Sequence, residues 1–345
     1  MNNRYLDSWL SAVASAIAQD SGLGGWLGQR ASLEAAAEVL EPVSFAPGET
    51  LVEQGAGDRD AWIVTEGTVA FEVQEGHGDV HSLHTAAAPS AFGTRAFAVG
   101  RTHNLTARAK TPVVAFGLTR RSLQNVAAVA PLVATGLVRW LAADVVHRIV
   151  QSRAGNNEER RFVLAFPRRK TLPQGQAMEA ASALLLTLRG FPAGTFEPLV
   201  PGIGEHIQIV QVAEGDAVVS HGDKERSLLL LLSGTSSSRT TKGRVLGRFT
   251  AGAAVSDEVM LGELGFLADV PRDGTVFADS AATFLEISTD ALPWLAQTLP
   301  DLTFQLHVAL LRTVCGRIEQ ADDARKHTQA ITAGHFDSWF DERDE

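Results

Sequence analysis

The stretch Phe45-Ala-Pro-Gly-Glu-Thr-Leu-Val-Glu-Gln-Gly55 and the later stretch Val212-Ala-Glu-Gly-Asp-Ala-Val-Val-Ser-His-Gly222 share the glycine pattern that decides the fold. Matching glycines recur at one constant spacing, and the pairs are Gly48 with Gly215, Gly55 with Gly222 and Gly67 with Gly234. At a slightly larger spacing, three further pairs match: Gly93 with Gly262, Thr106 with Thr275 and Ala109 with Ala278. Because glycine marks positions where the backbone turns, the sequence predicts an internal repeat.

Short runs rich in Val, Leu, Phe and Thr lie between these glycines. They cover residues 69–73, 113–118, 218–219, 228–232 and 283–287. Short apolar runs bounded by Gly, Asp and Ser are typical of strands joined by tight turns, and several at close spacing favour a β-barrel. We therefore expect an α+β protein with two β-barrel domains, each flanked by capping helices.

Helical patterns flank both copies of the repeat. We expect helices over residues 5–27, 32–40, 122–150, 176–188 and 291–323, with breaks at Pro293 and Pro300. The predicted divisions are N-terminal helices (1–42), the first barrel with its helix (43–150), a linker with helices (151–200), the second barrel with C-terminal helices (201–330) and an acidic tail (331–345).

The segment 156–175 is polar and basic and contains prolines, so we interpret it as the core of the linker. Its cationic side chains are Arg160, Arg161, Arg168, Arg169 and Lys170. Charge runs usually face solvent, and we interpret this one as a solvated stretch.

Composition narrows the class of protein. A chain of 345 residues has room for two domains, and its formal net charge of -10 argues against nucleic-acid binding. No run of about 18 apolar residues is present, so we expect no membrane span. The single cysteine, Cys315, cannot form an intramolecular disulfide and is interpreted as a core residue. These features, without a signal segment, predict a cytoplasmic location.

The most specific motif is Leu261-Gly-Glu-Leu-Gly-Phe-Leu-Ala-Asp-Val-Pro-Arg-Asp-Gly-Thr-Val276. A short helical turn that opens after a glycine can aim backbone N–H groups at a phosphate. Arg272 could close the other side as a planar, permanently charged donor. The motif therefore indicates a site for a phosphate monoanion.

This motif resembles the phosphate-binding cassette of the cyclic-nucleotide-binding domain family, whose usual pattern is Gly-Glu-Leu-Ala-Leu followed by Pro-Arg-Ala-Ala-Thr. With the glycine markers, the resemblance covers about residues 43–116 and 209–287. It implies jelly-roll barrels and a cyclic mononucleotide, cAMP or cGMP, as regulatory ligand, with Glu263 accepting a hydrogen bond from the ribose 2′-hydroxyl. The implied ligand-binding residues are Gly262, Glu263, Leu264, Arg272, Asp273, Gly274 and Thr275.

Two alternatives stay open at this site. Glu263 and Arg272 could form a plain ion pair at the barrel rim, with the glycines serving only turns. Asp273 stands where the family usually has alanine, so it could weaken anion binding by like-charge repulsion or could accept a hydrogen bond from a base.

The first copy departs further from the family pattern. Gly93-Thr-Arg-Ala-Phe97 replaces Gly-Glu-Leu-Ala-Leu, and His103 stands at the position of Arg272. A histidine is mostly neutral near pH 7 and is a poor substitute for a guanidinium. Arg95, Arg101 or Arg108 could compensate, but we expect this barrel to serve packing or partner recognition.

The sequence therefore predicts a non-catalytic regulatory protein that senses a cyclic mononucleotide in the second barrel and signals to a protein partner through the helices after residue 291. The rival is a ligand-free scaffold that uses both barrels as binding surfaces. We expect no enzyme activity and no helix-turn-helix for DNA, and association with further copies of the chain stays open.

Two groups of side chains have competing interpretations. His77, His81 and His84 surround a predicted hairpin, so we favour a solvated turn over a metal site. The aromatic residues of the terminal segments could dock a partner or pack helices on the barrels, and we favour packing; they are Trp9, Trp26, Phe336, Trp339 and Phe340.

Overall fold

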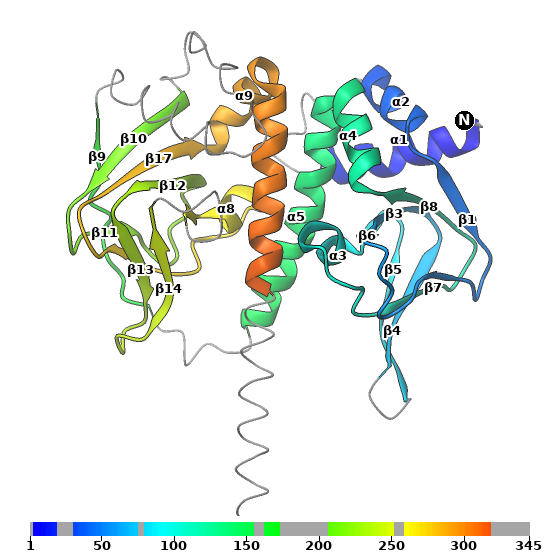
Figure 1. The fold of residues 1–345 in the computed structure, drawn as a ribbon, viewed down its shortest axis with the longest axis horizontal. Helices are drawn as coiled ribbons and strands as arrows, with labels where there is room; N and C mark the ends of the chain where they lie inside the picture. The colour runs from blue at the N-terminus through cyan, green and yellow to red at the C-terminus, as the bar shows by residue number, and fades with distance from the viewer. Residues whose placement is uncertain are drawn as a thin grey trace, which may run out of the picture.

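Two β-barrels lie on opposite sides of a central layer of helices (Figure 1). The computed structural model describes residues 3–18, 30–74, 79–154, 162–172, 206–251 and 259–318. The expected α+β architecture of two barrels with flanking helices is confirmed.

The first barrel consists of two four-stranded antiparallel sheets, with strand orders β1-β8-β3-β6 and β2-β7-β4-β5. Its strands are β1 (Pro42–Phe45), β2 (Thr50–Val52), β3 (Ala61–Glu66), β4 (Thr68–Gln74), β5 (Val80–Ala87), β6 (Ser90–Phe92), β7 (Thr106–Ala109) and β8 (Val113–Leu118).

The second barrel repeats this topology strand for strand. Its sheets have the orders β15-β12-β17-β10-β9 and β11-β16-β13-β14, so β9 is the added strand. The strands are β9 (Lys170–Thr171), β10 (Ile207–Val212), β11 (Ala217–Val219), β12 (Ser227–Ser233), β13 (Thr235–Arg239), β14 (Val245–Thr250), β15 (Met260–Leu261), β16 (Val276–Ala278) and β17 (Ala282–Ser288).

The matched glycines adopt the left-handed backbone conformation that joins the strands. The two members of each pair have similar φ angles. These are 89° at Gly48 and 84° at Gly215, 84° at Gly55 and 82° at Gly222, 90° at Gly67 and 87° at Gly234, and 75° at Gly93 and 83° at Gly262. Side chains other than glycine rarely adopt these angles. The repeat inferred from the glycines is therefore a repeat of backbone geometry.

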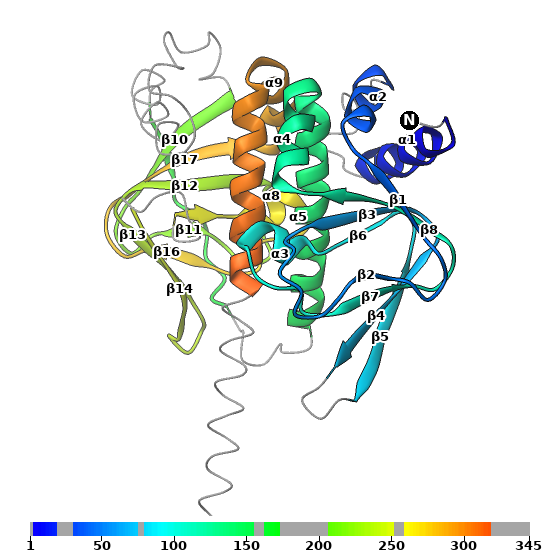
Figure 2. The ribbon, with the colours of Figure 1, turned by 45° about the vertical axis from the view of Figure 1, so that its right-hand side comes forward.

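The helices are α1 (Asn3–Ala18), α2 (Arg30–Glu38), α3 (Thr94–Val99), α4 (Arg120–Val129), α5 (Pro131–Ala154), α8 (Glu263–Leu267), the 3₁₀ turn η1 (Thr289–Ala291), α9 (Leu292–Thr298) and a helix over residues 300–318. In both ribbon views, α5 and helix 300–318 run side by side between the barrels (Figure 2). The expected helix over 176–188 lies outside the described residues.

Proline positions explain two corrections to the expected helices. The single helix expected over 122–150 is two helices, because Pro131 begins α5 and the chain turns at Ala130. The break expected at Pro293 is wrong, since this proline lies in the first turn of α9, where its missing N–H costs nothing. The break near Pro300 is present.

One apolar core joins the two barrels through the helical layer. It contains side chains of α5, such as Leu137 and Leu141, together with Leu264 of α8 and Leu310 of helix 300–318. Each barrel also encloses a smaller core of its own. Burial of apolar surface in this shared core therefore holds the two barrels and the helical layer together.

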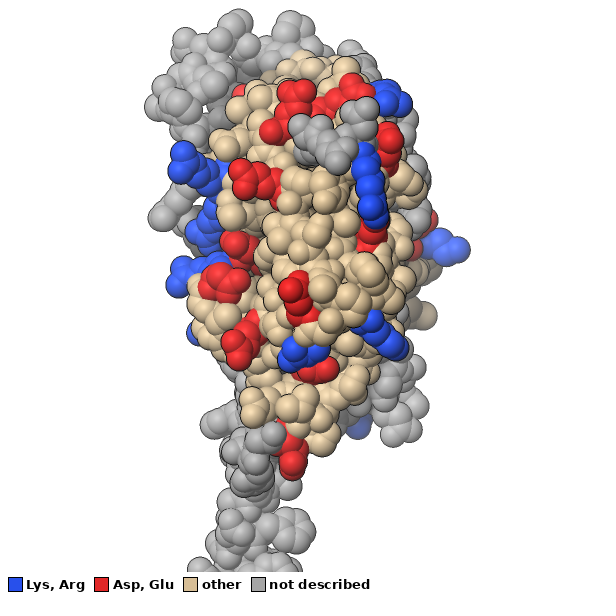
Figure 3. Space-filling model, turned by 90° about the vertical axis from the view of Figure 1, so that its right-hand side faces the viewer, with Lys and Arg blue, Asp and Glu red and all other residues tan. Residues whose placement is uncertain are grey.

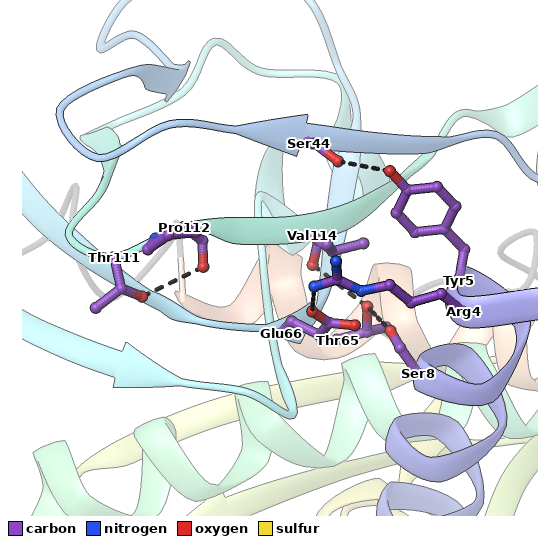
Figure 4. Close-up of polar contacts among 9 residues, drawn as sticks. All are labelled: Arg4, Tyr5, Ser8, Ser44, Thr65, Glu66, Thr111, Pro112 and Val114. Carbon is purple, nitrogen blue, oxygen red and sulfur yellow. Dashed lines mark hydrogen bonds and ion pairs between the residues drawn. The ribbon is translucent and has the colours of Figure 1, made fainter. Parts of the chain in front are cut away.

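Helix α1 is fixed to the first barrel by polar contacts (Figure 4) and by an aromatic contact. Ser8 donates a hydrogen bond to Thr65 (2.7 Å), and Arg4 pairs with Glu66 (3.1 Å). Trp9 is fully buried, donates to the carbonyl of Leu33 and packs on a barrel phenylalanine. The packing interpretation is confirmed for Trp9, and the other four aromatics lie outside the described residues.

The linker interpretation needs a correction at residues 162–172, because this segment lies against the second barrel. Arg169 is half-buried and pairs with Glu225 (2.5 Å) and Glu286 (2.7 Å), and residues 170–171 form strand β9 on β10. The solvated interpretation is therefore wrong for Arg169, because two carboxylates hold it. Arg168 and Lys170 are exposed, and Arg160 and Arg161 lie outside the described residues.

Two further observations concern possible membrane-spanning helices and the charge of the surface. Among the described residues, no helix is both long enough and apolar enough to cross a membrane. On the face of the first barrel drawn in Figure 3, acidic and basic side chains alternate with neutral ones, so the described part of that face carries no continuous basic surface.

Candidate functional site

The cassette of the second barrel begins at Gly262, between β15 and α8. Its φ of 83° places it in the left-handed region, and a Cβ there would overlap the Arg272 guanidinium and lie 2.6 Å from the carbonyl of Ser227. Only glycine fits this position. The close approach brings the guanidinium directly against the turn that opens α8.

Arg272 is buried without full compensation of its charge. The residue is 4% exposed, and its Nη2 donates to the hydroxyl of Ser227 at 2.9 Å. Among the described residues, its Nε and Nη1 have no hydrogen-bond partner. Burial lowers the pKa of the guanidinium, while Glu225 and Glu263 act in the opposite direction. An anion placed here would supply the missing acceptors.

Glu263 is buried at 1% exposure and pairs with Arg317 from helix 300–318. Arg317 also donates through Nη2 to the carbonyl of Met260 at 2.8 Å. The alternative of an ion pair between Glu263 and Arg272 is therefore wrong within the described part of the chain, because Glu263 pairs with the C-terminal helix instead.

The apolar residues of α8 face the helical layer. Leu264 and Phe266 are buried in the shared core, and the ring of Phe266 lies 5.8 Å from the guanidinium carbon of Arg139 on α5. Nη1 of Arg139 in turn lies 3.5 Å from Nε2 of His307. The cassette is thus in direct contact with helices of both halves of the molecule.

The last cassette residues contact the segment 162–172. Thr275 is fully buried, donates from its hydroxyl to the carbonyl of Val163 (2.5 Å) and accepts from the backbone N–H of His221 (3.0 Å). Gly274 lies beside the ring of Phe162, whereas Asp273 is exposed. The structure therefore groups Gly262, Glu263 and Arg272, and it leaves Asp273 at the surface.

Several functional partners were missed by sequence reasoning. Arg317, Ser227 and Phe162 lie far from the cassette in sequence, and no spacing rule connects them to it. Helix 300–318 carries two arginines, Arg312 and Arg317, among its apolar residues, and this charge in an apolar run is the one signal that could have pointed to Arg317.

The first barrel builds the same turn with different side chains. Gly93 (φ 75°) opens α3, and His103 lies beside it, with its Cε1 3.1 Å from a Cβ built on Gly93. His103 Nε2 is 3.8 Å from Asp58 and, like the hydroxyl of Thr94, has no hydrogen-bond partner among the described residues.

Compensation by Arg108 is not supported, since this side chain already has partners. It donates to the carbonyl of Gly48 (2.9 Å) and lies 3.5 Å from Glu72.

The described residues contain no group of three His, Cys, Asp or Glu side chains that could hold a metal ion. His84 stacks on Phe71, and His77 lies outside the described residues. Cys315 is buried in the shared core, as expected of a small apolar residue.

Comparison with known families identifies the first barrel. Residues 42–129 match the model of the cyclic nucleotide-binding domain family, and this range covers β1 through α4. No curated protein matches the chain.

Several solved structures are similar in arrangement. The regulatory domain of Toxoplasma gondii PKA, crystallised with cAMP, is 14% identical over 85% of this chain and 94% of its own, with a TM-score of 0.30. A cyclic nucleotide-binding domain from Methylobacillus flagellatus is 22% identical over 45% of this chain and 86% of its own, with a TM-score of 0.37. Catabolite Activator Protein of Thermus thermophilus is 19% identical over 50% of this chain and 73% of its own, with a TM-score of 0.34.

The family match and the internal repeat carry the assignment of the barrels. The second barrel repeats the strand order and the glycine turns of the matched domain. The first barrel therefore matches the cyclic nucleotide-binding domain family, and the second barrel repeats the fold of this matched domain in tandem.

Proposed function

We propose that the second barrel binds a cyclic mononucleotide at its cassette and that the protein regulates a protein partner in response. The binding residues are Gly262, Glu263, Leu264, Arg272, Gly274 and Thr275, and Asp273 lies at the rim of the site.

The single observation that carries the proposal is the buried guanidinium of Arg272. A charged group at 4% exposure with unpartnered Nε and Nη1 is costly unless an anion completes it. A cyclic phosphodiester has one negative charge and free oxygens that can accept a hydrogen bond from a guanidinium donor.

Glu263 connects ligand binding to the rest of the molecule. Arg317 donates to Oε1 of the Glu263 carboxylate, so a ribose 2′-hydroxyl that donates to Glu263 shares the carboxylate with helix 300–318 and weakens its pairing with Arg317. Helix 300–318 is then held less tightly at the cassette, and its preferred position changes. A ligand shifts such an equilibrium only by its difference in affinity for the two arrangements.

The test is calorimetric titration of the full chain with cyclic AMP and cyclic GMP. Arg272→Ala should weaken binding by about 100-fold or more, because charge-assisted hydrogen bonds are worth about 1.5–3 kcal/mol each. Glu263→Gln should weaken it about tenfold.

The matched control is His103→Ala, the same position in the first barrel, which should leave the affinity unchanged. Absence of heat with both nucleotides would favour the ligand-free scaffold. Equal binding by wild type and Arg272→Ala would show that the ligand occupies another site.

A further inference from the structure

Residues 162–172, called the strap below, run along the open side of the second barrel. The N–H of Arg168 donates to the carbonyl of Ala217 (3.0 Å), and the N–H of Leu172 donates to the carbonyl of Ile209 (2.8 Å). Residues 170–171 pair with β10, and Phe162 bridges to Thr240. The strap therefore touches both sheets of the barrel at its edges.

The centre of the strap is held by charge. Arg169 reaches Glu225 and Glu286 with separate nitrogens, at 2.5 and 2.7 Å. An open groove of about 640 Å³ is lined by strap residues 168–170 together with residues 211–213 and 281–283, so no filled apolar core lies under this part of the strap. Ion pairs of this kind release more readily than a filled core.

The start of the strap lies on the cassette. Ser238 pairs with Val276, whose side chain lies in the barrel core, so these two side chains share the inner face of the sheet. A Cβ on Gly274 would lie 3.1 Å from both the Phe162 ring and the hydroxyl of Ser238. The Phe162 ring is therefore at the inner side of the cassette and stacks on His221, with centroids 5.1 Å apart.

We propose that the strap is a built-in competitor for the ligand of the second barrel: Phe162 and Val163 cover Gly274 and Thr275, and they leave before a cyclic mononucleotide binds. This inference rests on the proposed function and adds a form of regulation to it. With the strap docked, the apparent affinity is the intrinsic affinity reduced by the fraction of molecules whose strap is released.

The decisive experiment compares two strap variants with two neighbouring controls in the full chain, by titration with cyclic AMP and cyclic GMP. Phe162→Ala removes the ring from the cassette, and Arg169→Gln removes the ion pairs that hold the centre of the strap to Glu225 and Glu286. Each should tighten binding about tenfold by raising the released fraction. The controls are Phe166→Ala and Arg168→Gln, whose side chains are 93% and 78% exposed, and they should leave the affinity unchanged.

A second readout follows the strap directly. In the free protein, the amides of Arg168 and Leu172 should be protected from hydrogen exchange, since both donate to the barrel backbone. Saturating ligand should remove this protection in the wild type, and Arg169→Gln should remove it without ligand.

The outcomes separate the two proposals. Arg272-dependent binding with unchanged or weaker affinity in Phe162→Ala and Arg169→Gln overturns the strap and leaves the proposed function intact. Protection of both amides that persists at saturation also overturns it. Absence of binding in the wild type and in both strap variants overturns the proposed function itself, and the competitor with it.

Discussion

The two cassettes share a backbone and differ in the side chains that face it. Gly93 and Gly262 have nearly the same φ, and each opens a short helix at the end of a matched strand. Beside the first lies His103, and beside the second lies Arg272. The fold of a cassette is thus fixed by its glycine turn, whereas its ligand chemistry depends on a few side chains that can change without loss of the turn.

A second difference concerns charge at the rim. In the second barrel, Arg226 pairs with Asp269, and the matching positions in the first barrel are Arg59 and Gly100. Arg59 lies beside Gly100 and Arg120, so this rim carries two neighbouring cations. The copies have diverged in surface electrostatics as well as at the site.

The glycine turns should give the largest effects and should affect both barrels alike. Gly262→Ala and Gly93→Ala should each lower the free energy of unfolding by about 3–5 kcal/mol, because a Cβ meets backbone atoms in addition to the strained φ. Chemical denaturation measures this. Gly222→Ala is the control, since it has the same kind of φ with open space around it, and should cost about 1–2 kcal/mol. Equal losses at positions 222 and 262 would contradict the steric account.

Removing Arg317 should affect the stability of the second copy only, because Thr94 stands at the position of Glu263 in the first copy. Arg317→Gln leaves the Glu263 carboxylate buried without its cation, and we expect a loss of about 3 kcal/mol in unfolding free energy. Glu263→Gln combined with Arg317→Gln should recover part of this loss, which a double-mutant cycle measures. Additive losses would show that the pair is not coupled.

Arg272 should lower the stability of the ligand-free protein, although the proposed ligand binding requires it. In the absence of ligand, Arg272→Met should raise the free energy of unfolding by about 1 kcal/mol, because burial disfavours a guanidinium whose Nε and Nη1 have no acceptor among the described residues, and methionine fills similar space. His103→Met at the matching position should not give this gain. A loss of stability in Arg272→Met would mean that the guanidinium is already compensated.

The ion pair of Arg226 and Asp269 should have the smallest effect on stability. Asp269→Asn should lower stability by less than about 1 kcal/mol and should lose even that effect in high salt, because Asp269 is 74% exposed. Thermal unfolding at low and high ionic strength tests this, and a salt-independent loss would point to a role for Asp269 other than its charge.

The repeat and the barrels could be predicted from the sequence because their determinants are local. A left-handed turn requires glycine at a fixed position, so the matched glycines indicate where the strands of each barrel end and turn. Helix ends were predicted less well where a proline could either break a helix or begin one, as at Pro131 and Pro293.

The contacts that complete the candidate site could not be predicted in this way. Arg317 and Phe162 reach the cassette through tertiary packing, and their partners lie far along the chain. The contacts of Arg169 are of the same kind, since nothing in the local sequence indicates that two carboxylates of the barrel surround it. The cassette motif itself was local and could be recognised.

The number of ligand molecules bound per chain tests the central difference between the copies most directly. Calorimetry with cyclic AMP and cyclic GMP should give one equivalent of the nucleotide that binds for the wild type and for His103→Ala, and none for Arg272→Ala at the same concentrations, because its affinity is about 100-fold lower. Two equivalents, or one equivalent that disappears with His103→Ala and survives Arg272→Ala, would contradict the account.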